Sequence, residues 1–67
     1  MEKPEDLQDL RRLYAEKQFT AQGLARLIGR STSTVHNALV NEIDPQYALV
    51  VAMLDGVHKI ARGESKR

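Results

Sequence analysis

The 67-residue sequence contains no cysteine and no tryptophan, and its aromatic residues are two tyrosines and one phenylalanine. Without cysteine the chain can form neither a disulfide nor a thiolate metal site. Its two histidines, His36 and His58, lie 22 positions apart in the sequence and form no ligand cluster. Because a core of this size rarely supplies more than about 3–5 kcal/mol, we expect one small domain that is stabilised by pairing with a second copy.

Residue groups typical of enzymes are also missing. The sequence has no cysteine nucleophile, no paired carboxylates in a plausible pocket and no glycine-rich phosphate loop. We therefore predict that the protein is not an enzyme, and we expect no cofactor, no metal and no small-molecule ligand. No stretch approaches the roughly 20 apolar residues of a membrane span, and the acidic opening MEKPEDLQDL is unlike a signal peptide. These features predict a cytoplasmic protein that does not bind a membrane.

The net charge is only +1, but the charges are unevenly distributed. Residues 17–40 contain three basic residues and no acid, whereas residues 41–55 contain three acids and no base. Residues 56–67 are basic again, with four basic residues against one acid. The positive charge therefore collects on the middle of the chain and on its end, where an anionic partner could be met.

Helix-start and helix-stop signals divide the sequence. Pro4 and the acids after it suit a first helical turn, Thr20 and Ser31 are good N-caps, and Asp44–Pro45 is a further start signal. Gly29 suits the left-handed residue that ends a helix. Apolar residues recur at three- and four-residue steps after each start. The sequence predicts helices over about residues 4–17, 21–28, 32–40 and 45–62.

Two glycines leave alternatives open. Gly23 interrupts the second helix and indicates a close backbone approach, either to the first helix or to a phosphate. Gly56 weakens the last helix, so two shorter helices are possible there. We predict an all-α fold, a small bundle of four to five helices with a central helix-turn-helix at about residues 21–40. The domain would span residues 1–63, and residues 64–67 would form a disordered basic tail.

The spacing around Gly29 is typical of two helices that cross steeply. Ala25 lies four residues before this glycine and can fit where the helices touch, and Val35 lies six residues after it and can fill the angle between them. This pattern resembles the helix-turn-helix of the phage-repressor and Cro-like family of DNA-binding proteins. The resemblance implies that the second helix enters the major groove of double-stranded DNA. It also implies a repressor in the bacterial nucleoid or a phage-infected cell, often one that controls its own promoter.

On this resemblance the polar residues of the second helix would contact DNA. Asn37 is the strongest candidate, since its amide can form two hydrogen bonds with adenine; the alternative is an ordinary solvated side chain. The threonines could instead bond their own backbone. We expect Tyr14, Phe19 and Tyr47 in the core and His58 on a solvated face. The base-reading candidates are Ser31, Thr32, Ser33, His36 and Asn37, and the phosphate-binding candidates are Lys17, Gln22, Arg26, Arg30 and Thr34.

The run 49–54 is apolar at every position. A helix that is apolar on all faces must be covered on all faces, so we expect this C-terminal helix to pair two copies. The predicted function is a dimeric repressor that binds an inverted-repeat operator. The alternatives are a protein-interaction module that binds no DNA, and a DNA-architectural or recombination accessory protein. The predicted homodimer interface consists of Leu49, Val50, Val51, Met53, Leu54 and Val57.

Overall fold

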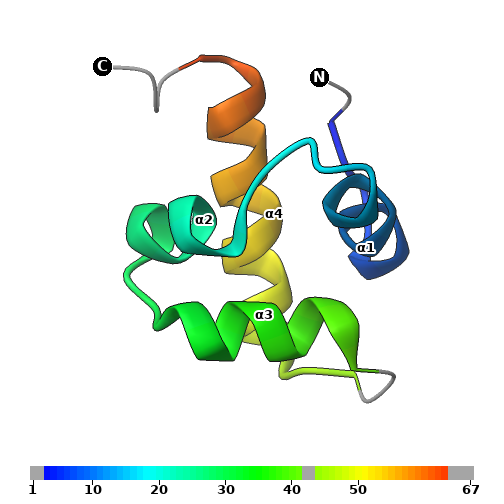
Figure 1. The fold of residues 1–67 in the computed structure, drawn as a ribbon, viewed down its shortest axis with the longest axis vertical. Coiled ribbons are helices and arrows are strands. Elements are labelled where there is room, and N and C mark those ends of the chain that lie inside the picture. The colour runs from blue at the N-terminus through cyan, green and yellow to red at the C-terminus, as the bar shows by residue number, and fades with distance from the viewer. Residues whose placement is uncertain (1–2, 42–43, 64–67) are drawn as a thin grey trace.

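The computed structural model describes residues 3–41 and 44–63. This part of the chain contains four α-helices and no strand, which confirms the predicted all-α fold. In Figure 1, α4 stands upright between α1 and α2, and α3 lies across its lower end. The predicted basic tail, residues 64–67, lies outside the described residues. The helices are α1 (Leu7–Ala15), α2 (Ala21–Ile28), α3 (Thr32–Val40) and α4 (Tyr47–Ala61).

The predicted caps set the boundaries of the helix-turn-helix. The Thr20 hydroxyl accepts a hydrogen bond from the Gly23 amide at 3.0 Å, and the Ser31 hydroxyl accepts one from the Thr34 amide at 3.2 Å. Both cap residues have extended backbone, and each supplies an acceptor for a free amide of the first turn. Asn41 follows the last residue of α3, which confirms the predicted helix over residues 32–40.

Two left-handed residues turn the chain. Gly29 has φ 73° and ends α2 as predicted, and the next amide, that of Arg30, donates to the Ala25 carbonyl at 2.9 Å. Lys17 has φ 61°, and its amide donates to the Tyr14 carbonyl at 3.0 Å. Because this turn closes α1 early, the first helix ends at Ala15 and not at residue 17 as predicted.

The N-terminal segment differs from the prediction. α1 begins at Leu7 and not near Pro4, because Asp6 caps the helix by accepting from the Asp9 amide at 2.9 Å. Pro4 is buried outside the helix, and its carbonyl accepts a hydrogen bond from His58 Nε2 at 2.7 Å. His58 is half-buried, so its expected solvated position is wrong. Its bond ties the N-terminal segment to α4.

The start of α4 also differs from the prediction. Asp44 and Pro45 precede the helix, which begins at Tyr47 after an extended Gln46 that makes no side-chain cap bond. The Asp44 carboxylate lies 3.9 Å from Nη1 of Arg11 in α1, where it forms an ion pair. The Asp44–Pro45 pair therefore belongs to the connection from α3 and does not form the first helical turn.

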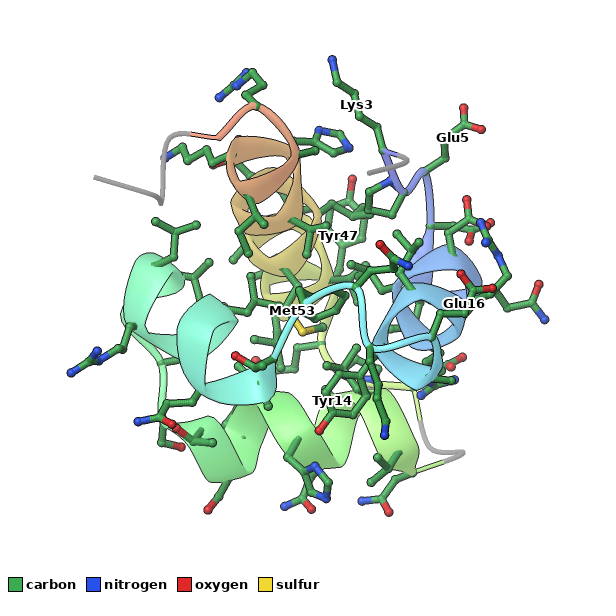
Figure 2. All side chains as sticks on the ribbon, turned by 45° about the horizontal axis from the view of Figure 1, so that its top comes forward. Lys3, Glu5, Tyr14, Glu16, Tyr47 and Met53 are labelled. Atoms are coloured by element: carbon green, nitrogen blue, oxygen red, sulfur yellow. The ribbon has the colours of Figure 1, made fainter. Side chains whose placement is uncertain are left out.

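The core lies where α1 and α2 meet α3 and α4, and each helix contributes a face to it. Figure 2 shows Met53 of α4 in the middle of the molecule, between the other helices, and its side chain is fully buried. The buried apolar residues are Leu10, Leu13, Phe19, Ala21, Leu24, Ala25, Val35, Ala38, Leu39, Leu49, Met53 and Val57.

The structure decides between the two alternatives for Gly56 and excludes one of the two for Gly23. α4 continues unbroken through Gly56, which is buried. A Cβ at this position would lie 2.6 Å from Leu24 Cδ1 and 2.7 Å from Ile28 Cγ2. Gly56 therefore lets α4 approach α2 closely. Gly23 is exposed, and a Cβ there would come near only the Thr20 hydroxyl, at 3.0 Å, so it marks no close approach to α1.

Candidate nucleic-acid interface

α3 has one apolar face and one polar face. Val35, Ala38 and Leu39 are buried against the other helices. In Figure 1, α3 runs along one edge of the molecule. The residues predicted to read bases are all exposed: Ser31, Thr32, Ser33, His36 and Asn37.

The polar groups of α3 divide into two sets. The Ser31 hydroxyl lies 2.7 Å from the Thr34 hydroxyl and also caps the helix. These two side chains are thus committed to the start of α3. Within residues 3–41 and 44–63, by contrast, the side chains of Thr32, Ser33 and Asn37 make no hydrogen bond. Their donors and acceptors are free to bind an external partner.

His36 is a predicted reading residue whose partner lies on another helix. Its Nδ1 lies 2.9 Å from the Tyr14 hydroxyl of α1, and the two rings meet edge-on with centroids 6.1 Å apart. Tyr14 also packs against Phe19, with ring centroids 5.7 Å apart. Tyr14 was expected to be a core residue, and sequence reasoning missed its polar contact. No local signal could have indicated it, because 22 residues separate the two partners.

A second contact from α1 reaches the C-terminal part of α3, two residues beyond His36. Arg11 Nε and Nη2 donate to the Ala38 carbonyl at 3.3 and 3.1 Å. This carbonyl belongs to the last turn of α3, where backbone acceptors lack helical partners and a positive charge is favourable. Arg11 thereby fixes α3 to α1, and sequence reasoning did not predict this role. The middle and the C-terminal part of α3 are therefore both bonded to α1.

The predicted phosphate-binding residues are exposed. Within the described ranges, no acid forms an ion pair with Lys17, Arg26 or Arg30. Arg11 and Arg12 differ, because each lies within 4.0 Å of a carboxylate. Gln22 lies in the first turn of α2, beside its free amides, and Thr34 is engaged by Ser31. The three basic residues Lys17, Arg26 and Arg30, which pair with no acid in these ranges, therefore lie on and beside the helix-turn-helix.

The prediction of a pairing surface on α4 is wrong for some of its residues. Leu49, Met53 and Val57 are buried in the chain's own core and cannot form an interface as well. The reason is helical periodicity, since a continuous apolar run turns every third or fourth residue inward. Val50 and Leu54 are half-buried, and Val51 is 44% exposed. Tyr47, expected in the core, is 82% exposed. We call Tyr47, Val50, Val51 and Leu54 the outer face of α4.

The described residues bring together no group of three or more His, Cys, Asp or Glu side chains that could hold a metal ion. None of their helices is long and apolar enough to cross a membrane. No family model, curated protein or solved structure matches the chain. The resemblance to the phage-repressor and Cro-like family stays a prediction.

Proposed function

We propose that this protein is a sequence-specific, double-stranded DNA-binding transcriptional regulator. It acts as a dimeric repressor on an inverted-repeat operator, including one at its own promoter. The observation that carries the proposal is the exposed, uncommitted polar face of α3. Thr32, Ser33 and Asn37 project from a helix whose opposite face is locked into the core. A helix of this kind fits the major groove, which is about 12 Å wide.

Asn37 has the clearest reading chemistry. Its amide offers a donor and an acceptor, which pair with N7 and N6 of adenine in two hydrogen bonds. Thr32 and Ser33 lie one turn earlier, near the start of the helix, where repressor-type helices approach the bases. Their hydroxyls can donate or accept, and the Thr32 methyl can contact a thymine methyl. The two groups of residues would read neighbouring base pairs.

A pair of chains supplies the affinity that one chain lacks. Lys17, Arg26 and Arg30 give each copy few phosphate contacts, so a monomer binds weakly at physiological salt. Two copies paired through the outer face of α4 double these contacts and read two half-sites. In a two-fold dimer the half-sites lie about one helical turn apart, roughly 10 base pairs.

Asn37→Ala tests the reading function. We expect the substitution to reduce discrimination at one base pair of each half-site by roughly five- to 150-fold, which corresponds to about 1–3 kcal/mol for a bidentate contact. Folding should be unchanged, because Asn37 is exposed and its side chain bonds nothing among the described residues. Fluorescence titration against the preferred duplex and its single-base variants measures the effect.

Gln8→Ala is the matched control, because Gln8 is an exposed amide on α1. It should leave the base preference unaltered. Equal preference in Asn37→Ala and wild type would contradict the proposed reading role. A wild-type chain that binds no duplex would instead favour a protein-interaction module, for which the exposed Tyr47 on α4 is the supporting observation.

Arg26→Gln combined with Arg30→Gln tests the phosphate contacts. Log affinity falls as log salt concentration rises, and each lost phosphate contact makes this negative slope shallower by about 0.9. We expect affinity to fall to a similar degree for all sequences, while the ranking of base variants is kept. Titrations at several salt concentrations give the slope. An unchanged slope would show that neither arginine contacts a phosphate.

A further inference from the structure

The Tyr14–His36 contact joins the reading helix to a residue outside the helix-turn-helix. The Tyr14 ring is supported on one side by Phe19, which is buried. Its hydroxyl lies 2.9 Å from Nδ1 of His36, which is exposed on α3. The imidazole is therefore held by a group whose own position is set by the core. An exposed histidine without such a partner would sample several rotamers.

The contact also determines which hydrogen-bonding group His36 presents. A neutral imidazole carries one N–H, and the other nitrogen is an acceptor. A phenol is a stronger hydrogen-bond donor than acceptor, which favours donation from the Tyr14 hydroxyl to Nδ1. The ring proton then lies on Nε2. With Nδ1 occupied, the nitrogen left for an external partner is a donor.

We propose that Tyr14 is a specificity-determining positioning residue of the DNA interface. By donating to Nδ1, it makes His36 present an Nε2–H donor to the major groove. This donor suits bases with acceptors at their major-groove edge, first guanine with N7 and O6, and it disfavours cytosine, whose amino group is itself a donor. The inference rests on the proposed DNA-reading function and adds to it a residue from α1.

Tyr14→Phe isolates the hydroxyl, because it keeps the ring that packs against Phe19. We expect the fold and the Asn37-dependent preference to be kept. Discrimination at the base pair read by His36 should fall roughly two- to tenfold, the equivalent of one neutral hydrogen bond. His36→Ala should affect the same base pair. The double variant should be no worse than His36→Ala alone, since Tyr14 acts through His36.

Nitrogen-15 NMR of the imidazole gives a second readout that needs no DNA. In the free wild-type protein, the His36 signals should report the Nε2–H tautomer with Nδ1 as a hydrogen-bond acceptor. Tyr14→Phe should produce a mixture of the two tautomers. Tyr47→Phe is the matched control, because it removes the hydroxyl of a tyrosine that is 82% exposed on α4, and it should retain the wild-type tautomer.

The outcomes separate this inference from the proposed function. Suppose that the wild-type protein selects DNA sequences and that Tyr14→Phe has the same base preference and the same His36 tautomer. This result overturns the role of Tyr14 and leaves the proposed DNA reading intact. An Nδ1–H tautomer in the wild type likewise overturns it. A wild-type chain with no sequence preference overturns both proposals. Both proposals are supported if Tyr14→Phe loses base preference only at the base pair read by His36 and also changes the His36 tautomer.

Discussion

Val51→Glu is expected to convert the paired protein to monomers and to lower its affinity for an operator with two half-sites by about 100-fold or more. Joining two reading units commonly raises affinity by about 10²–10⁴. In a single chain Val51 is 44% exposed, so a glutamate there stays in water and the fold is kept. At an interface between copies, the same carboxylate would be buried without a partner, which is strongly unfavourable. Sedimentation and DNA titration measure the two effects.

Gln8→Glu provides the control for this experiment. It adds the same negative charge at an exposed position of α1, so it should change neither the oligomeric state nor the affinity by more than a small factor. A wild-type protein that sediments as a monomer at the concentrations that bind DNA would contradict pairing through the outer face of α4. An unchanged dimer in Val51→Glu would exclude Val51 from the interface.

Gly56→Val should lower the free energy of unfolding by about 3 kcal/mol, as expected for overpacking a closely packed site. The Cβ of a residue at position 56 would lie 2.6 Å from Leu24 Cδ1 and 2.7 Å from Ile28 Cγ2. Leu24 is fully buried and has little room to move. Since a core of this size supplies only about 3–5 kcal/mol, much of the protein would unfold. Chemical denaturation followed by circular dichroism measures the change.

Gly56→Ala refines this test, because helix propensity and packing act in opposite directions. At an open helical position the substitution would stabilise by about 1 kcal/mol. For Gly56→Ala we expect the free energy of unfolding to fall by about 1 kcal/mol, because overpacking costs about 1–3 kcal/mol and outweighs the gain in helix propensity. Ala48→Val, at an exposed position of the same helix, should cost less than about 1 kcal/mol. A more stable Gly56→Ala protein would show that α2 and α4 do not pack as described.

The helix-turn-helix could be predicted because its signals are local. Thr20 and Ser31 each cap a helix through an amide three residues later, and Gly29 takes the left-handed conformation that few other residues tolerate. Such features depend on groups within one helical turn. The alternation of Val35 and its buried neighbours with polar residues likewise indicates which face of α3 lies outward.

The contacts that support the site could not be predicted, because they join distant segments. Arg11 bonds the Ala38 carbonyl across 27 residues, and His58 bonds the Pro4 carbonyl across 54 residues. Each charged or polar side chain, taken alone, resembles an ordinary surface residue. Their partners become evident only when α1 is packed against α3 and α4. The same holds for the bond between Tyr14 and His36.

The outward face of α4 was ambiguous for a different reason. A run of apolar residues has no polar side to mark the solvent, so periodicity could not separate Met53, which is buried, from Val51, which is not. Gly56 was ambiguous as well, because a glycine in a helix indicates either a break or a close contact. The packing of α2 against α4 shows that Gly56 marks a close contact between these helices and not a break.

Selection of bound sites from random duplex DNA tests the central claim most directly. Incubating the wild-type protein with a random pool and sequencing the retained duplexes should yield two inverted half-sites about 10 base pairs apart. Each half-site should contain an adenine whose enrichment disappears in Asn37→Ala. Retained duplexes with no common sequence, or no retention at any salt concentration, would contradict the claim that the outward side of α3 reads DNA.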